Sequence, residues 1–177
     1  MNLALIGYRG TGKTTVAQEL ARRLEWSWLD ADVELERRAG RTIKQIFATG
    51  GEAAFRDLEE QVIADLAARD QWVLALGGGA ILRASNRATI AERCRTVWLT
   101  AKPSTILTRI QADASTTDRR PNLTAAGGLE EIEQLLAVRT PLYRECADCT
   151  VVTDDRSPES LADEILASIG PMLGLTK

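Results

Sequence analysis

The sequence predicts an α/β protein of three layers, in which helices cover both faces of a five-stranded parallel sheet. Short apolar runs suited to strands alternate with stretches whose apolar residues recur at helical spacing. The five runs are residues 2–6, about 27–29, 72–76, 96–99 and 149–153. Because helical crossovers join parallel strands with one hand, we expect helices on both faces and ligands at the carboxyl ends of the strands.

The first apolar run ends in a phosphate-binding motif. Residues 7–14 read G-Y-R-G-T-G-K-T and fit the P-loop pattern without a gap. The glycines allow a tight turn whose N–H groups converge on a polyphosphate, Lys13 can reach the terminal oxygens, and the hydroxyl of Thr14 can bind Mg²⁺. The next helix adds its positive dipole end. We therefore expect a nucleoside triphosphate here rather than a glycine-rich turn without a ligand.

Length and composition indicate one compact domain over residues 1–177. The chain is 45% hydrophobic, enough for a substantial core, but 177 residues are few for two nucleotide-binding domains. A net charge of −3 argues against a general nucleic-acid-binding protein. There is neither an apolar run near 18 residues nor a basic leader, so we expect a cytoplasmic protein without a membrane partner.

The three cysteines are not expected to form a metal or redox centre. Cys146 and Cys149 make a C-x-x-C pair, but there is no second pair, and the chain contains no histidine to complete a zinc site. With Cys94, they are interpreted as reduced thiols in or near the core.

Two acids, Asp30 and Asp32, follow the second predicted strand and lead into a helix over 33–39. Carboxylates at this edge can hold Mg²⁺ directly or through water, and one can accept a proton from an attacking hydroxyl. An Asp before a helix can also serve only as its N-cap, so a structural role stays open for either residue.

Three consecutive glycines, Gly77 to Gly79, follow the third predicted strand. Such a run suits a sharp turn or a backbone that a ligand approaches closely. Because it ends a core strand at the same edge as the P-loop, a backbone platform for a substrate is favoured over a simple loop.

A further helix carries Phe55, Leu58, Val62 and Leu66 on one face. Arg56 lies off that stripe, and Glu59 or Glu60 can steady its guanidinium. From spacing alone, this is a weak ion pair on the helix surface.

Residues 111–128 lack apolar periodicity and contain Arg119 and Arg120. A polar loop of this length is usually a disordered insertion or a lid over an active site. The arginine pair favours a mobile lid over about 111–125.

Taken together, these segments resemble the shikimate kinase family. The likeness spans residues 3 to about 168, and its motifs occur in the order and spacing of that family. Besides the P-loop they are Asp30-Ala31-Asp32, Gly40-Arg41-Thr42-Ile43 with Ile46-Phe47, Gly51-Glu52 with Phe55-Arg56, Gly77-Gly78-Gly79, Arg120-Pro121-Asn122-Leu123 and Arg139-Thr140-Pro141-Leu142-Tyr143. Each motif recurs among P-loop kinases, but the combination is specific to this family.

The resemblance implies a nucleoside-monophosphate-kinase-like fold and transfer of the ATP γ-phosphate to the 3-hydroxyl of shikimate, in chorismate and aromatic amino-acid biosynthesis. It implies catalytic roles for Lys13, for Asp32 as candidate base, and for Arg120 as the lid arginine. Thr14 and Asp30 correspond to the Mg²⁺ site. The implied ATP contacts are Gly10, Thr11, Gly12, Lys13, Thr14, Thr15, Arg109, Arg120 and Arg156.

For the acceptor, the resemblance implies a helical binding segment over about 31–62. The implied contacts are Asp32, Arg56, Gly78, Gly79, Arg139, Phe47 and Phe55. We expect a monomer whose partner is the small-molecule substrate. Three alternatives stay open, namely a kinase for another small acid such as gluconate, a nucleoside-monophosphate kinase, and a non-catalytic relative that senses shikimate.

Overall fold

The computed structural model describes residues 1–113 and 128–174, and its five strands form one parallel sheet, as predicted. The strand order is β2-β3-β1-β4-β5, with every neighbouring pair parallel. The strands are β1 (Asn2–Ile6), β2 (Ser27–Asp30), β3 (Trp72–Ala75), β4 (Cys94–Thr100) and β5 (Cys149–Val152). The helices are α1 (Lys13–Leu24), α2 (Ala31–Ala39), α3 (Ile43–Ala67), α4 (Ala84–Arg93), α5 (Pro103–Ala112), α7 (Gly128–Cys146), α8 (Pro158–Ile169) and the short 3₁₀ helix η1 (Gly170–Leu173).

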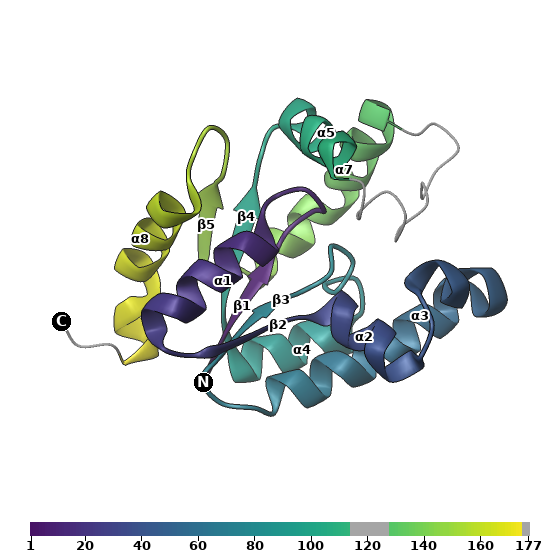
Figure 1. The fold of residues 1–177 in the computed structure, drawn as a ribbon, viewed down its shortest axis with the longest axis horizontal. Helices are drawn as coiled ribbons and strands as arrows, with labels where there is room; N and C mark the ends of the chain where they lie inside the picture. Colours follow the sequence, from purple (N-terminus) through teal and green to yellow (C-terminus); the bar gives the residue numbers. More distant parts are fainter. Residues whose placement is uncertain (114–127, 175–177) are drawn as a thin grey trace.

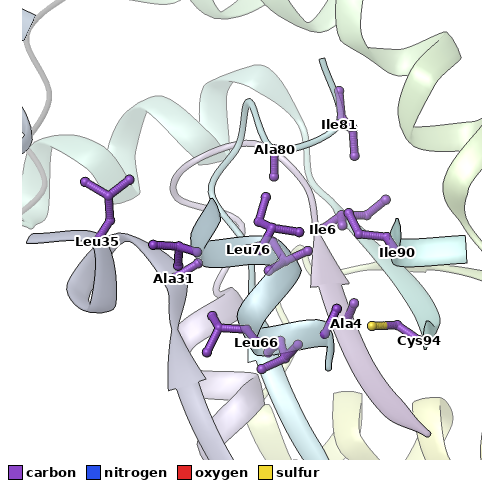
Figure 2. Close-up of a cluster of buried hydrophobic side chains, with 14 of the residues drawn as sticks. Ala4, Ile6, Ala31, Leu35, Leu66, Leu76, Ala80, Ile81, Ile90 and Cys94 are labelled. Atoms are coloured by element: carbon purple, nitrogen blue, oxygen red, sulfur yellow. The ribbon is translucent and has the colours of Figure 1, made fainter. Parts of the chain in front are cut away.

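Helices cover both faces of the sheet, which confirms the three-layer prediction. On β1, Ala4 and Ile6 face a core shared with α2, α3, α4 and α7, whereas Leu3 and Leu5 face a second core shared with α1 and α8. Figure 1 shows α1 beside α8, and Figure 2 shows Ala4 and Ile6 within the first core. The alternation follows from the pleat of a strand, which sends successive side chains to opposite faces.

The central strand, β1, places the P-loop at the switch point of the sheet, where later strands are added on either side of it. β1 lies between β3 and β4, and β2 and β5 form the edges. In open parallel sheets the crevice at such a point, beyond the carboxyl ends of the strands, is where ligands bind. A small cluster of Tyr8, Ala101, Ile106 and Ile132 attaches α5 and α7 to this end.

The helices that carry the predicted acceptor residues differ in detail from the prediction. α2 begins at Ala31 rather than at residue 33, because Asp30 caps it. α3 starts at a capping box formed by Thr42 and Gln45, and it is interrupted at Gly51, whose φ of 68° and ψ of −170° are not helical. The left-handed φ at this position favours glycine, which explains why a glycine stands at the break.

The cysteines are free, as predicted. Cys146 packs with the first core and Cys149 with the second, so the two residues of the C-x-x-C pair lie against opposite faces of the sheet. Within residues 1–113 and 128–174, no helix combines the length and apolar character needed to cross a bilayer.

Candidate active site

The P-loop adopts the tight turn that its glycines permit. Gly7, Gly10 and Gly12 have φ values of 139°, 79° and 86°, and Gly12 is the N-cap from which α1 begins at Lys13. A methyl group on Gly7 would lie 2.2 Å from the carbonyl oxygen of Leu99, so the first glycine also allows β1 to turn against β4. The backbone N–H groups at the start of α1 are thus left for an anion.

The Lys13 ammonium is held inside the loop. Its Nζ donates to the carbonyl oxygens of Gly7 at 2.9 Å and Tyr8 at 2.8 Å. Thr11 closes the same turn, since its hydroxyl donates to the Tyr8 carbonyl at 2.8 Å. These contacts position a cation over the mouth of the loop, where phosphate oxygens can take over its hydrogen bonds.

Thr14 and Asp30 meet, although 16 residues separate them. The Thr14 hydroxyl donates to Asp30 Oδ2 at 2.8 Å, while Asp30 Oδ1 accepts the backbone N–H of Asp32 at 3.0 Å. Asp30 can therefore cap α2 with Oδ1 and still offer Oδ2, beside the Thr14 hydroxyl, to a metal ion. A hydroxyl and a carboxylate oxygen are hard donors that suit Mg²⁺, which usually keeps waters and phosphate oxygens as its other ligands.

A cavity of about 470 Å³ joins the P-loop to the carboxyl ends of β2 and β3. Its wall also contains Arg9, Trp28, Val33 and Asp113, which the sequence did not single out. The predicted site residues that line it are Gly10, Gly12, Lys13, Thr14, Thr15, Asp30, Asp32, Gly78 and Arg109. Phosphate-binding groups, a carboxylate pair and the glycine turn thus share one space.

Arg56 is buried, so the expectation of a surface ion pair is wrong. Its side chain is 9% exposed and donates from Nη1 to Glu59 Oε2 at 2.6 Å, and Glu59 is 4% exposed. Glu60 instead pairs with Arg83. The cause is Gly79, where a methyl group would lie 2.4 Å from Arg56 Nη1, so the guanidinium rests directly on the glycine turn.

Arg139 reaches the same turn from α7. Its Nη1 donates to the Gly78 carbonyl at 3.3 Å, and the Tyr143 hydroxyl, one helical turn further on, donates to the same oxygen. Arg56 and Arg139 therefore meet the glycine turn from two different helices. Beside Arg56, the rings of Phe47 and Phe55 stack with centroids 4.9 Å apart and provide an apolar wall.

Sequence reasoning missed the roles of Tyr8 and Arg9. Two guanidinium groups lie near the Tyr8 ring, with the Cζ atoms of Arg9 and Arg139 at 5.9 and 5.7 Å from its centroid. Arg9 also donates to the buried Glu131 of α7 at 3.1 Å. Burial raises the pKa of Tyr8 above its usual value, so its hydroxyl stays protonated. The place of Arg9 within the P-loop is the sequence signal that could have suggested a role for it. Its partner Glu131 lies 122 residues away, so the sequence alone could not identify the contact.

On the nucleotide side, Arg109 connects the P-loop to the end of β5. Its guanidinium donates to Gly10 O at 3.4 Å, to Thr153 Oγ1 at 2.9 Å and to Thr153 O at 2.7 Å. Arg156 is directed elsewhere, because it pairs with Glu164 and donates to Ser160 of α8. Arg119, Arg120 and most of the predicted lid at 111–125 lie outside the described residues.

A P-loop at the switch point of a five-stranded parallel sheet, facing a carboxylate pair and a glycine turn, defines a P-loop phosphotransferase of the nucleoside-monophosphate-kinase-like class. The sequence model described as "Shikimate kinase" matches residues 9–170. The chain belongs to the shikimate kinase family.

Individual relatives agree with this assignment. A shikimate kinase from Rhodopirellula baltica is 41% identical over 173 residues, covering 98% of this chain and 92% of the relative. The solved structure of a shikimate kinase from Acinetobacter baumannii in complex with shikimate has a TM-score of 0.90 and 39% identity, and covers 97% of this chain and 93% of that one. A gluconokinase from Sinorhizobium meliloti, with a TM-score of 0.57 and 15% identity, shares the fold alone.

Proposed function

We propose that the protein is a shikimate kinase that transfers the γ-phosphate of ATP to the 3-hydroxyl of shikimate, giving shikimate 3-phosphate and ADP on the route to chorismate and the aromatic amino acids. The observation that carries the proposal is the glycine turn, which lines the cavity beside the P-loop and is contacted by the buried guanidinium groups of Arg56 and Arg139. Such an arrangement suits an acceptor with one carboxylate and several hydroxyls.

This geometry supports the acceptor roles that the family resemblance implies. Arg56 and Arg139 would bind the carboxylate, Gly78 and Gly79 would offer backbone contacts, and Phe47 and Phe55 would face the ring. Asp32, which lines the cavity at the start of α2, would accept a hydrogen bond from the attacking hydroxyl and then its proton. Since phosphoryl transfer passes through a loose transition state, weak assistance from a carboxylate is sufficient.

The nucleotide would be held by the P-loop backbone, with Lys13 exchanging its two carbonyl partners for phosphate oxygens. Thr14 and Asp30 would hold Mg²⁺, which neutralises charge on the phosphates when bound. We include Gly10, Thr11, Gly12, Thr15 and Arg109 among the nucleotide contacts. Arg120 and Arg156 remain predictions of the family pattern, since the former lies outside the described residues and the latter pairs with Glu164.

We further propose a cytoplasmic monomer consisting of one kinase domain over residues 1–177, with the acceptor segment at about 31–62 and the lid at about 111–125. The decisive measurement is ADP release with and without shikimate, set beside gluconate and nucleoside monophosphates as acceptors. Stimulation by shikimate alone is the expected result. ADP release that is equal with and without shikimate would refute the proposal.

Asp32→Asn tests the assigned base. We expect kcat to fall about 10²- to 10⁴-fold, because the carboxylate that accepts the proton is gone while the P-loop is intact. The KM for ATP should change little. Asp163→Asn is the matched control, since Asp163 is an exposed residue of α8 that pairs with Arg23. Turnover of Asp32→Asn near that of the control would remove Asp32 from the chemistry.

A further inference from the structure

Two carboxylates surround the guanidinium of Arg56. Glu59 binds Nη1, and Glu52 Oε1 accepts from both Nε, at 3.2 Å, and Nη2, at 3.0 Å. The guanidinium also lies near the Phe55 ring, with Cζ 5.1 Å from the ring centroid, and rests on Gly79. The single positive charge of Arg56 is thus matched by two negative charges.

The two carboxylates differ in how firmly they are held. The side chain of Glu59 is 4% exposed, whereas that of Glu52 is 62% exposed. Glu52 is the first residue after the break at Gly51, so it stands at the start of the second half of α3 and reaches Arg56 one turn later. An exposed ion pair is weak, because water replaces the lost partner at little cost. Glu59 is therefore a fixed partner, and Glu52 can exchange.

Binding a third carboxylate to Arg56 is unfavourable while both Glu52 and Glu59 remain in place, because the like charges repel each other. Arg56 itself is 9% exposed, and Glu52 occupies its Nε–Nη2 edge, an edge that can bind a carboxylate with two parallel hydrogen bonds. An anionic acceptor that binds this edge therefore meets the negative charge of Glu52.

We propose that Glu52 is an internal competitor of the acceptor, a side chain that occupies the carboxylate position on Arg56 in the empty site and leaves when the acceptor's carboxylate binds. This inference rests on the proposed function of Arg56. It makes Glu52 a residue that sets acceptor affinity through Arg56 and takes no part in phosphoryl transfer.

The test compares Glu52→Gln and Glu52→Ala with wild type in steady-state kinetics at saturating ATP. We expect the KM for shikimate to fall about two- to fivefold in both variants, the range of a weak exposed ion pair, with kcat and the KM for ATP little changed. Direct binding of cyclohex-1-ene-1-carboxylate, measured by calorimetry, should tighten by a similar factor, because it carries the carboxylate without the reacting hydroxyls.

Glu60→Gln is the matched control. It lies on the same helix, is 38% exposed and pairs with Arg83, which keeps Asp57 as a second partner. A purely supporting role for Glu52 predicts the opposite sign, since a less ordered Arg56 would raise the KM for shikimate. An unchanged or raised KM in both Glu52 variants, with thermal unfolding like that of wild type, overturns the proposal. A wild-type protein without shikimate-dependent turnover would overturn the proposed function, and this inference with it.

Discussion

A single missing methyl group decides where the Arg56 side chain can lie. The guanidinium occupies the space that a side chain at Gly79 would fill, with Nη1, Nη2 and Cζ all within 2.7 Å of the position of such a Cβ atom. The guanidinium is held in this position by the hydrogen bond from Nη1 to Glu59. The role of Gly79 is therefore to admit an arginine from α3, in addition to any backbone contact with the acceptor.

Gly79→Ala should displace Arg56 and raise the KM for shikimate about tenfold or more, the loss expected when a charge-assisted hydrogen bond is removed. Steady-state kinetics of the single variants and of Gly79→Ala/Arg56→Ala measure this directly. If the effect acts through Arg56, the second substitution adds little to the first. Fully additive losses would show that the alanine methyl blocks the acceptor by itself.

The sequence identifies site residues that belong to a contiguous motif. It does not identify residues whose position depends on a neighbour far away in the chain. Lys13 was predicted from a contiguous motif, and it lies in the cavity wall. The burial of Arg56 depends on Gly79, which is 23 positions away, and helical spacing contains no information about that contact. Arg9 and Glu131 escaped notice for the same reason.

Among the elements, α7 supports the glycine turn through two residues four positions apart. Arg139 and Tyr143 lie on one face of the helix and donate to the same carbonyl oxygen, that of Gly78. Tyr143 is fully buried and its ring stacks on Trp98 of β4, with centroids 5.7 Å apart. The spacing within the R-x-P-L-Y segment thus has a structural cause that the sequence alone did not reveal.

Tyr143→Phe should keep this packing and lose one hydrogen bond to Gly78. We expect the free energy of unfolding to fall by about 1 kcal/mol and the KM for shikimate to rise a few-fold, because the turn is less firmly held. Chemical denaturation and kinetics measure the two effects. Tyr8→Phe is the comparison for stability, because the buried Tyr8 hydroxyl makes no hydrogen bond to a backbone carbonyl within the described residues. Equal destabilisation of both variants would contradict the assignment.

A buried acid, Glu34, forms ion pairs that stabilise α2 and connect it to α3. Glu34 is 5% exposed and accepts hydrogen bonds from Arg37 and Arg38, and Arg38 also pairs with Asp65 of α3. The hydrogen bond from Arg37 is the largest cause that lowers the pKa of Glu34 to about 2 from 4.5. A depressed pKa means that the stabilisation is complete above the unfolded value and is lost as the pH falls through the folded one.

Glu34→Gln should therefore lower the free energy of unfolding by about 1 kcal/mol at pH 7, a modest value because Arg37 is largely in solvent. The difference from wild type should shrink as the pH falls below about 4.5. Denaturant unfolding of both proteins between pH 7 and pH 3 gives this difference directly. A difference that stays constant over the range would show that the charge of Glu34 contributes nothing.

For the whole molecule, the alternation of strand-like and helical segments along the chain was enough to predict a three-layer α/β fold. All five strands were predicted, since each is a short apolar run, and the crossover rule fixed their parallel direction. Their order in the sheet was left open, because it depends on which helix stripes fit together. The break of α3 at Gly51 was also missed, since a glycine in a helical pattern is compatible with a continuous helix.

The three thiols differ in how deeply they are buried. Cys94 is 3% exposed in the first core, and burial raises its pKa to about 12, whereas Cys146 and Cys149 are half-buried. Iodoacetamide should modify Cys146 and Cys149 in the native protein and leave Cys94 unmodified until the protein unfolds. Peptide mass spectrometry, with a sample in guanidinium chloride as reference, reads out all three sites. Labelling of native Cys94 as fast as Cys149 would contradict the packing of this core.

The contact between α1 and α8 has a consequence for biosynthesis. Leu161 and Ile165 of α8 pack in one core with Val16 and Leu20 of α1, the helix that begins at Lys13 of the P-loop. During translation, α1 is synthesised early and α8 late. The apolar face of α1 therefore stays exposed to water until α8 has left the ribosome and can pack on it. We expect a nascent chain arrested before α8 to retain no triphosphate and to present that bare stripe to chaperones.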